Sequence, residues 1–292
     1  MELNVMEALK QGCAILKNNN VSVPRLEAEM LMAHLLKCQR HELYLASDRE
    51  LDSSQVQQYF ELIEKRASGC PVQYIINRRE FMGLDFYVDQ RVLIPRVDTE
   101  ILVEHVIDWA SRQGKGLRIL DLGTGSGAIA VSLAVFIPGA HITAIDISSE
   151  ALEVAKYNAR LHGVEGRIAF LEGDLFSPLH CHPGMCPFDA VVFNPPYIPT
   201  GDIETLEAQV RDYEPRLALD GGADGLRFYS RLADDCVYWL KPGGLLAVEV
   251  GYGQSKVVKT IFQDTGYYQN IGTVRDLAGI ERVVYATYSP DL

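Results

Sequence analysis

The sequence predicts an α/β protein built on a doubly wound sheet and preceded by a small helical domain. Three observations indicate this fold. The first seventy residues repeat apolar side chains at helical spacing. From residue 117 onward, short apolar runs alternate with helical segments, which is typical of parallel strands joined by crossover helices. The first of these runs leads directly into a glycine-rich loop, residues 123–127, of the kind that lets a ligand approach a helix N-terminus.

The helical domain is expected over residues 1–70. Pro24 suits the first turn of one helix, and Asp52 with Gln55 three residues later resembles a capping box. That last helix should end before Gly69. The domain contains no carboxylate pair, no nucleophile beside a base and no glycine-rich loop, so we expect it to bind a macromolecular partner. Packing against the next domain is the alternative.

Residues 71–96 have the composition of a β-hairpin linker. Both Val72–Ile76 and residues 81–88 are rich in β-branched and aromatic side chains, and Gly83 suits a turn. The following segment, residues 91–96, is expected either to line a cleft or to serve as a plain linker.

The α/β domain is expected over residues 97–292. Its strands are predicted at residues 117–122, 141–145, 167–171, 188–193, 245–250, 267–274 and 282–288, the last two as a hairpin. Its helices are predicted at residues 98–109, 128–137, 150–161, 226–240 and 254–263. The long loop after Tyr197 is expected to be a lid or binding segment, because structureless loops of that length are uncommon.

The glycine-rich loop allows two classes of cofactor. Gly123, Gly125 and Ala128 satisfy the dinucleotide-binding pattern, and Asp146 at the tip of the second strand is placed to accept from ribose hydroxyls. Asp121 immediately before the loop favours the other class, because its carboxylate would repel a pyrophosphate. S-adenosylmethionine, with a sulfonium and an ammonium group, suits that carboxylate.

The third strand ends at Gly173, followed by Asp174 and Leu175. Asp174 is placed to accept from the amino group of adenine, with apolar neighbours along the ring. A turn-forming aspartate is the alternative interpretation.

The fourth strand runs into Asn194, Pro195, Pro196 and Tyr197. Proline cannot donate to a strand ladder, so this tip presents acceptors: the Asn194 amide oxygen and prolyl carbonyls, beside an aromatic ring. Such a tip suits a planar NH2 group as substrate. The Asn194 oxygen and the Pro195 carbonyl can hold both N–H bonds and aim the nitrogen lone pair, and the motif supplies no general base. A proline-rich turn that merely leaves a core strand is the alternative.

The composition excludes several classes of function. Acidic residues outnumber basic residues by 39 to 27, for a net charge of −12, which disfavours nonspecific nucleic-acid binding. The longest apolar stretch, residues 128–137, is too short to span a bilayer, and Glu2 and Glu7 fit neither a signal nor a transit peptide. We therefore expect no membrane association and a cytoplasmic location.

The cysteines also favour a reducing cytoplasm, because they are scattered in a chain too large to need disulfides. They are Cys13, Cys38, Cys70, Cys181, Cys186 and Cys236. A local cluster of His180, Cys181, His182 and Cys186 matches no familiar zinc spacing, so no metal site is expected.

Taken together, these motifs resemble those of the class I S-adenosylmethionine methyltransferases. Within that class the chain closely resembles the protein-(glutamine-N5) methyltransferases of the PrmC/HemK type, which modify peptide-chain release factors. The Asn-Pro-Pro-Tyr motif is shared with adenine-N6 and some guanine-N2 methyltransferases, so the full set carries the resemblance. The matching segments are residues 71–75, 80–83, 92–96, 99–100, 121–127, 194–197, 214–215, 221–225 and 277–279.

The resemblance implies a seven-stranded, mostly parallel sheet whose last strand is antiparallel. It implies methyl transfer from S-adenosylmethionine, leaving S-adenosylhomocysteine, to the glutamine of the Gly-Gly-Gln motif in release factors. We expect a monomer with no direct nucleic-acid contact. The expected cofactor-binding residues are Gly123, Thr124, Gly125, Ser126, Gly127, Asp146, Asp174, Leu175 and Asn194, and the expected catalytic residues are Asn194, Pro195, Pro196 and Tyr197.

Two positions depart from the pattern of these relatives. Asn77 stands where a glycine is expected in the hairpin, and Leu175 stands where some relatives carry an aromatic ring beside adenine. The second departure is expected to weaken stacking without changing the reaction.

Three classes of function remain as hypotheses from the sequence. The first is a protein-glutamine methyltransferase, the second a nucleic-acid amino-methyltransferase acting on a flipped base, and the third a noncatalytic dinucleotide-binding module. The net charge of −12 counts against the second, and Asp121 together with the Asn-Pro-Pro-Tyr motif counts against the third.

Overall fold

The computed structural model describes residues 3–181 and 187–290. The chain forms two compact units, one of Met1–Arg78 with Glu207–Tyr213 and the other of Arg79–Leu206 with Glu214–Leu292. The predicted division at residues 70 and 96 stays a prediction, and the two units are described separately below.

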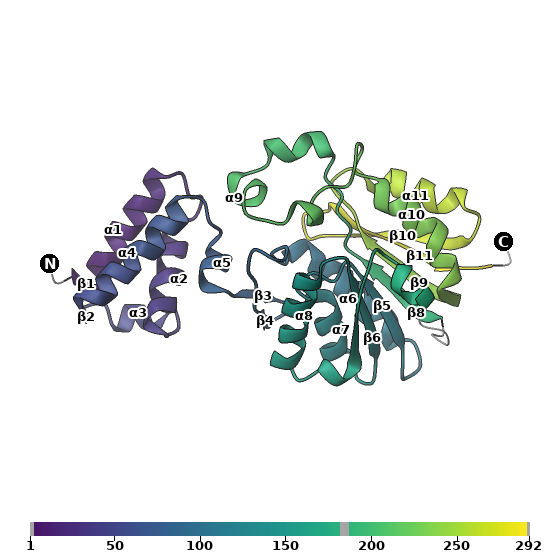
Figure 1. Ribbon diagram of the computed structural model, residues 1–292, viewed down its shortest axis with the longest axis horizontal. Helices are drawn as coiled ribbons and strands as arrows, with labels where there is room; N and C mark the ends of the chain where they lie inside the picture. The colour runs from purple at the N-terminus through teal and green to yellow at the C-terminus, as the bar shows by residue number, and fades with distance from the viewer. Residues whose placement is uncertain (1–2, 182–186, 291–292) are drawn as a thin grey trace. The chain divides into compact units, whose positions relative to one another are not determined.

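The first unit is helical (Figure 1). Capping boxes begin two of its helices: Asn4 with Glu7, and Asp52 with Gln55 as predicted from the sequence. The side chain of Tyr59 is fully buried and lies against Gly12, where a Cβ would come within 2.4 Å of the tyrosine oxygen. Its elements are β1 (Leu3–Asn4), α1 (Val5–Asn18), α2 (Pro24–Leu36), α3 (Glu42–Leu45), β2 (Glu50–Leu51), α4 (Ser53–Ala67), α5 (Val72–Ile76) and α9 (Ala208–Arg211).

Helix α9 belongs to this unit although it is distant in sequence. Arg66 on α4 forms a buried ion pair with Glu27 and also donates to Gln209 Oε1 at 3.2 Å. The Tyr213 hydroxyl donates to the Ser68 carbonyl at 3.1 Å. Residues 207–213, in the middle of the long loop after Tyr197, therefore belong to the helical unit, which the sequence did not indicate.

The prediction that Val72–Ile76 is a strand was wrong, because this segment is helix α5. Val72 and Ile75 lie on one side of the single helical turn and are buried, so tertiary burial overrides their β propensity. Asn77 ends the helix with φ 52°, a left-handed conformation that asparagine tolerates. This role accounts for asparagine at the position where a glycine was expected.

The second unit begins with a short hairpin, β3 (Arg79–Phe81) and β4 (Leu84–Phe86). Its turn lies at Met82 and Gly83, whose φ angles of 53° and 70° are those of a primed hairpin turn. The Met82 backbone N–H donates to the Glu100 carboxylate at 2.7 Å, which stabilises the unusual methionine conformation. A hairpin does lie within residues 71–96 as predicted, but it does not pair Val72–Ile76 with residues 81–88, and its strands are shorter than expected.

A seven-stranded sheet forms the centre of this unit, in the order β10-β11-β9-β8-β5-β6-β7. The final strand, β11, pairs antiparallel with both neighbours, and the other pairs are parallel, as the resemblance implied. The strands are β5 (Arg118–Leu122), β6 (His141–Asp146), β7 (Ile168–Glu172), β8 (Phe188–Phe193), β9 (Leu240–Glu249), β10 (Tyr268–Arg275) and β11 (Glu281–Tyr288).

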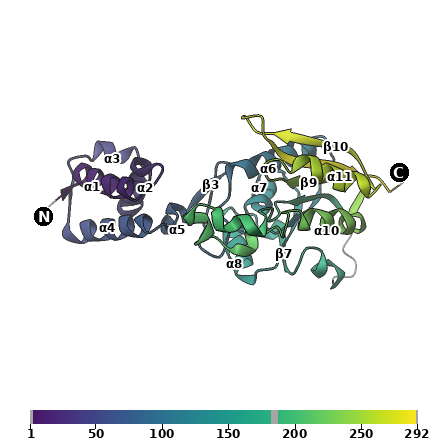
Figure 2. The same cartoon turned by 90° about the horizontal axis from the view of Figure 1, so that it is seen from above.

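Helices cover both faces of the sheet (Figure 2). Successive strand residues point to opposite faces, so Ile119 packs with one helical layer and Leu120 with the other. Strands buried on both faces read as continuous apolar runs, which is why the sequence revealed them. One layer contains α6 (Val97–Ser111), α7 (Ala128–Phe136) and α8 (Ser149–Leu161), and the other contains α10 (Arg227–Asp235) and α11 (Ser255–Asp264).

Short 3-10 turns fill several connections, and some predicted bounds shift. The helix expected over residues 226–240 ends at Asp235 and continues as one 3-10 turn. Strand β9 begins at Leu240, ahead of the predicted residue 245, with a break in its register against β8. The 3-10 turns are η1 (Glu165–Arg167), η2 (Ser177–Cys181), η3 (Thr200–Thr205), η4 (Arg216–Ala218) and η5 (Cys236–Tyr238).

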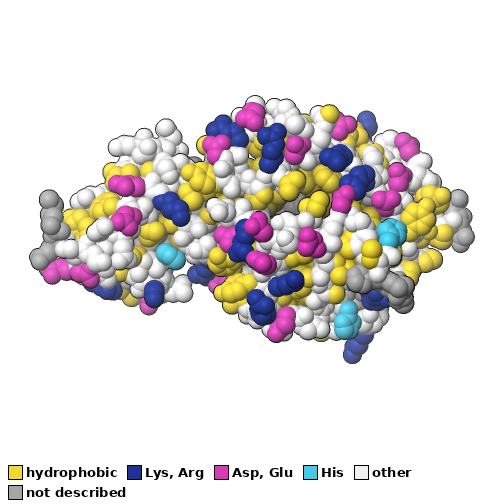
Figure 3. All heavy atoms as spheres, in the orientation of Figure 1, with side chains coloured by type: hydrophobic (Ala, Val, Ile, Leu, Met, Phe, Trp, Pro, Cys, Tyr) yellow, Lys and Arg dark blue, Asp and Glu magenta, His cyan; other side chains and the backbone are white. Residues whose placement is uncertain are grey.

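Positive and negative side chains are interspersed on the face shown in Figure 3. No continuous basic patch is seen on that face, which agrees with the net charge of −12. Among residues 3–181 and 187–290, no helix has the length and apolar character that crossing a membrane requires.

Candidate functional site

Strands β7, β6, β5 and β8 lie side by side and end at the same edge of the sheet. The register pairs Leu122 with Ile145 on one side and with Phe193 on the other, and pairs Asp146 with Glu172. The glycine-rich loop, Asp146, the segment after Glu172 and the Asn-Pro-Pro-Tyr motif therefore follow neighbouring strand tips. Ligands of doubly wound proteins bind at this carboxyl edge.

The glycine-rich loop joins β5 to α7 through left-handed conformations at Gly123, Gly125 and Gly127. Gly127 begins α7, and a Cβ there would lie 3.1 Å from the backbone of Ala155 on α8. The Thr124 N–H donates to the Ile145 carbonyl at 2.9 Å, which ties the loop to β6. The loop is thus compact, and Gly123 at its start is exposed, whereas Gly127 at the N-terminus of α7 is buried.

Asn158, on α8, hydrogen-bonds the glycine-rich loop. The sequence analysis did not select this residue. Its side chain is fully buried. The amide NH2 donates to the Ser126 carbonyl at 2.8 Å and to the Tyr87 carbonyl at 3.0 Å, and the amide oxygen accepts from the Tyr87 N–H at 2.8 Å. One side chain therefore joins the glycine-rich loop to the segment that follows β4.

Asp146 accepts two backbone hydrogen bonds, from Gly125 at 2.8 Å and from Ser148 at 2.9 Å. Burial nevertheless raises its pKa above the ordinary aspartate value. Each carboxylate oxygen keeps a lone pair, so Asp146 can hold the loop and still accept from a ligand hydroxyl. Ile147, the next residue, leaves 57% of its surface exposed at this tip, and the sequence analysis did not select it.

Asp121 lies beneath the loop and is fully buried. Its Oδ2 accepts from the Thr124 hydroxyl at 2.6 Å, whereas Oδ1 has no hydrogen-bond partner among the described residues. Burial is the main cause that raises the pKa of Asp121 to about 7. A buried carboxylate oxygen without a partner is a costly feature that a cationic ligand group would relieve.

Asp174 and Leu175 follow β7, where the sequence placed them. Asp174 forms an ion pair with Arg231 on α10, with an N···O distance of 2.7 Å. Leu175 has φ 47° and is buried with the neighbouring Phe176 in the core beneath the sheet edge. Contact of these two residues with adenine stays a prediction.

The Asn-Pro-Pro-Tyr motif presents two acceptors without protein partners. The Asn194 amide nitrogen donates to Thr99 Oγ1 at 3.0 Å, so the amide oxygen is turned away from Thr99. Neither that oxygen nor the Pro195 carbonyl accepts a hydrogen bond from the described part of the chain. The side chain of Tyr197 is held by Glu249, which accepts from its hydroxyl at 3.3 Å, and burial raises the pKa of Tyr197.

The loop after Tyr197 folds back on the motif. The Gly221 N–H donates to the Ile198 carbonyl at 2.8 Å. A Cβ on Gly221 would lie 2.8 Å from the Pro196 carbonyl oxygen, and one on Gly225 would lie 2.3 Å from the Tyr197 carbonyl oxygen. Both glycines are therefore needed for this close approach of two backbones.

The structure also brings together two segments that the sequence analysis left separate. Arg96 precedes α6, and Glu214 follows α9; the two form an ion pair with an N···O distance of 2.6 Å. The Glu214 side chain is only 1% exposed, and its Oε2 has no partner among the described residues. The expectation that residues 91–96 line a cleft stays a prediction, but this segment does contact the loop that follows the motif.

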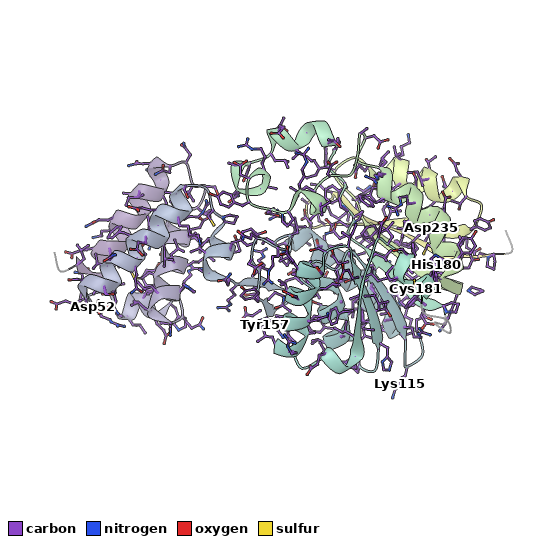
Figure 4. All side chains as sticks on the ribbon, viewed as in Figure 1. Asp52, Lys115, Tyr157, His180, Cys181 and Asp235 are labelled. Carbon is purple, nitrogen blue, oxygen red and sulfur yellow. The ribbon has the colours of Figure 1, made fainter. Side chains whose placement is uncertain are left out.

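A separate surface cavity of about 490 Å³ contains none of the predicted site residues. Tyr157 of α8, labelled in Figure 4, forms part of its wall. The cavity is lined by Tyr87, Arg91, Glu153, Lys156, Tyr157 and Arg160.

His180 and Cys181 lie on η2 (Figure 4), while His182 and Cys186 of the same cluster lie outside the described residues. The His180 ring packs edge-on against Trp239, with ring centres 5.2 Å apart. In the part of the chain that is described, no three His, Cys, Asp or Glu side chains are grouped as metal ligands would be.

Comparison with known proteins agrees with the division into a helical and an α/β unit. The sequence matches the family described as PrmC N-terminal domain over residues 7–76 and a methyltransferase domain over residues 113–274. A solved methyltransferase from Pyrococcus furiosus shares the fold, with a TM-score of 0.50 and 18% identity, over 72% of this chain and 91% of that one. The matched family and the fold thus define a methyltransferase.

Sequence relatives narrow the class. The release factor glutamine methyltransferase of Moorella thermoacetica is 43% identical over 97% of this chain and 98% of its own length. A solved release-factor-specific protein-(glutamine-N5) methyltransferase from Alicyclobacillus acidocaldarius is 33% identical over 70% of this chain and 100% of its own, with a TM-score of 0.42. The chain belongs to the release factor glutamine methyltransferase family.

Proposed function

We propose that this enzyme transfers a methyl group from S-adenosylmethionine to the side-chain amide nitrogen of a glutamine in peptide-chain release factors. Family membership supports the reaction class. The observation that carries the proposal is the pair of unpartnered acceptors at the tip of β8, the Asn194 amide oxygen and the Pro195 carbonyl. A primary amide brings two N–H bonds, which match two acceptors.

The chemistry requires orientation more than acid–base catalysis. An amide nitrogen is a weak nucleophile because its lone pair is delocalised into the carbonyl group. Two acceptors that hold both N–H bonds aim the nitrogen and stabilise the positive charge that develops there during transfer. The cofactor, when bound, supplies an electrophilic methyl group. A proton can leave the nitrogen after transfer, so no strong base needs to contact it beforehand.

The cofactor site that we propose lies at the adjacent strand tips. Asp121 suits the ammonium group of S-adenosylmethionine, because its buried Oδ1 has no partner among the described residues. Asp146 suits the ribose hydroxyls, and Asp174 with Leu175 is assigned to the adenine end. The other cofactor-binding residues that we propose are Gly123, Thr124, Gly125, Ser126, Gly127 and Asn194.

The helical unit is the part that we propose to grip the release factor. Its residues 7–76 match a domain that occurs in this family. Two protein contacts, one at the acceptor glutamine and one at the helical unit, would raise the effective concentration of the glutamine at the site. Action on release factors implies a cytoplasmic location, and a monomer remains our expectation for the active species.

The test is a mass measurement of purified release factor after incubation with this enzyme and S-adenosylmethionine. We expect the glutamine of the Gly-Gly-Gln motif to gain one methyl group. Asn194→Ala removes one acceptor and should cost about 2 to 4 kcal/mol of transition-state stabilisation in single-turnover methylation, with cofactor affinity measured separately. Wild-type turnover by this variant would show that the motif is only a structural turn.

Asn194→Asp separates anchoring from transition-state geometry. An aspartate keeps acceptor oxygens but places a full negative charge beside the sulfonium group, which favours the bound cofactor before reaction more than the transition state. We expect cofactor binding to tighten and the rate to fall. Methylation of adenine in DNA, with none on the release factor, would overturn the proposal in favour of a nucleic-acid methyltransferase.

A further inference from the structure

Exposed apolar side chains gather at the edge of the sheet that carries the Asn-Pro-Pro-Tyr motif. In the described part of the second unit, five large apolar side chains are at least 62% exposed. Tyr238 precedes β9 and therefore lies at the opposite edge. The other four lie at the carboxyl edge of the parallel strands and are called the apolar rim: Val97, Leu217, Tyr252 and Leu277. Single exposed apolar residues are normal on a protein surface, but four at one edge indicate an interaction site.

Val97 and Leu217 lie on segments that hydrogen-bond the motif or the residue after it. Val97 is the first residue of α6, and Thr99 in the same helical turn accepts from the side chain of the motif asparagine at 3.0 Å. Leu217 lies on η4, and the carbonyl of Leu219 accepts from the N–H of Ile198 at 3.0 Å. Both exposed side chains are therefore close to the proposed acceptor site in the connectivity of the fold.

Tyr252 lies in a turn that one side chain fixes to the motif. The Gln254 amide oxygen accepts from the Gly251 N–H at 3.0 Å, and its NH2 group donates to the carbonyl of the motif tyrosine at 3.0 Å. Tyr252 lies between these two residues in the chain and is 82% exposed. An exposed aromatic side chain is thus held on a hydrogen-bonded turn beside the motif.

Leu277 is fully exposed in the turn between β10 and β11. Asp276 orders this turn, because its Oδ1 accepts from two backbone N–H groups of the turn at 2.9 Å each. Its Oδ2 accepts from Arg282 at 2.9 Å, and Arg282 also pairs with Asp98 in the first turn of α6 at 3.0 Å. An apolar side chain on a turn that is already ordered costs little additional backbone entropy when a partner binds.

The positive charges beside the rim are already paired. Within two positions of a rim residue the sequence has no lysine, and each arginine there contacts a carboxylate. Few charges are therefore left to neutralise phosphates, so the rim suits a protein surface better than a nucleic acid. The pairs are Arg96 with Glu214, Arg216 with Asp220, and Arg275 with Glu281.

We propose that the apolar rim is a docking surface for the release factor, which contacts it with the protein surface that flanks the methylated glutamine. This inference rests on the proposed function for the identity of the partner. It deepens that function by naming where on the second unit the partner docks. The position of the rim supports this occupant, because a protein that presents a glutamine to Asn194 has to cover the segments that are hydrogen-bonded to the motif. Apolar surface buried in that contact contributes to affinity.

The first test measures methylation of intact release factor by Leu277→Asp, with Leu161→Asp as the matched control. Leu161 is 53% exposed at the end of α8, which lies at the opposite edge of the sheet. In Leu277→Asp we expect the KM for release factor to rise about tenfold, while kcat at saturating release factor and the Kd of S-adenosylmethionine stay as in the wild type. Leu161→Asp should match the wild type in all three quantities. An unchanged KM in Leu277→Asp would overturn the proposal.

The second test measures binding directly, by calorimetry of release factor with the enzyme saturated with S-adenosylhomocysteine. Tyr252→Ser should weaken binding about tenfold, and its combination with Leu277→Asp should weaken binding about 100-fold, since separate contacts add. The matched control Tyr238→Ser, at the opposite edge, should bind as the wild type does. Wild-type affinity in the double variant would refute docking at the rim.

The same variants distinguish other occupants. A wild-type dimer in sedimentation that Leu277→Asp dissociates would assign the rim to a second copy of this chain and overturn the proposal. Binding of duplex DNA that Leu277→Asp abolishes would overturn it in favour of nucleic acid.

Failure of the docking surface can also be told from failure of the proposed function. If the wild type methylates release factor and Leu277→Asp keeps the same KM, the docking surface fails and the function stands. If release factor binds the wild type more tightly than Leu277→Asp but its glutamine is not methylated, the function fails and the docking surface stands.

Discussion

Replacing Asp121 with asparagine should stabilise the unliganded enzyme at pH 8 and weaken its binding of S-adenosylmethionine. Asp121 is fully buried, and one of its carboxylate oxygens has no partner among the described residues. Burial raises its pKa from 3.8 to about 7. The folded protein therefore favours the protonated form more than the unfolded chain does.

The sign and size of the effect follow from linkage between protonation and folding. Because the pKa is raised on folding, the contribution of Asp121 to stability is fully present below about pH 4 and is lost as the pH rises through about 7. Between pH 5 and pH 8 this loss amounts to about 2 to 3 kcal/mol of the free energy of unfolding. Asparagine does not ionise, so the variant should not show this loss.

Asparagine has its own cost at this position. Its oxygen can still accept from the Thr124 hydroxyl, but its NH2 group replaces the oxygen that lacks a partner, at a cost of about 1 to 3 kcal/mol. That cost is the same at both pH values. The change in stability with pH is therefore the quantity to measure. On going from pH 5 to pH 8, the free energy of unfolding of Asp121→Asn should rise by about 2 to 3 kcal/mol relative to that of the wild type.

Urea denaturation at pH 5 and pH 8 measures this difference, with exposed Asp48→Asn as the control. Calorimetry at pH 8 should show that Asp121→Asn binds S-adenosylmethionine more weakly by about 1.5 to 3 kcal/mol, the typical value of a hydrogen bond to a charged group. Parallel stability curves for wild type and Asp121→Asn would refute the buried-titration argument. Unchanged affinity would refute the ammonium assignment.

Three further changes test other parts of the structure. Asp146→Ala should weaken S-adenosylmethionine binding by about 1 to 3 kcal/mol in calorimetry, through loss of the ribose acceptor, and tight NAD binding without S-adenosylmethionine binding would contradict this assignment. Asn158→Ala removes three hydrogen bonds to Ser126 and Tyr87 and should lower the free energy of unfolding by about 3 kcal/mol in urea, with weaker cofactor binding; wild-type stability would show that the loop needs no such support. A variant lacking residues 1–70 should still bind the cofactor but methylate intact release factor far more slowly, because orientation by the helical unit is lost; unchanged kinetics would show that these residues only pack.

The sheet could be read from the sequence because its strands are buried on both faces. Residues 188–193 are apolar except at Asp189, and that pattern is a direct consequence of helices on both sides. The glycine-rich loop could also be predicted, since Gly123, Gly125 and Gly127 adopt left-handed conformations that few other residues tolerate. An apolar strand and a glycine in a left-handed conformation can both be predicted from residue types within a short segment.

Local propensity failed where burial decided the conformation. The segment Val72–Ile76 has strand-forming side chains but folds as a helical turn, because that turn buries Val72 and Ile75 in the helical unit. Helix α9 likewise packs against α4 through Gln209, a contact between residues 143 positions apart. No periodicity in the sequence reports an interaction of that kind.

The sequence by itself determined the class of fold, the order of the strand tips and the chemistry of the acceptor motif, because these depend on residue type and short spacing. Only the tertiary structure decided which way the Asn194 amide faces, since Thr99, which accepts from the amide nitrogen, comes from α6 and meets the motif through helix packing. It also decided that the carboxyl groups of Asp121 and Glu249 titrate near neutral pH, because burial, which depends on the whole fold, sets the energy of a charge.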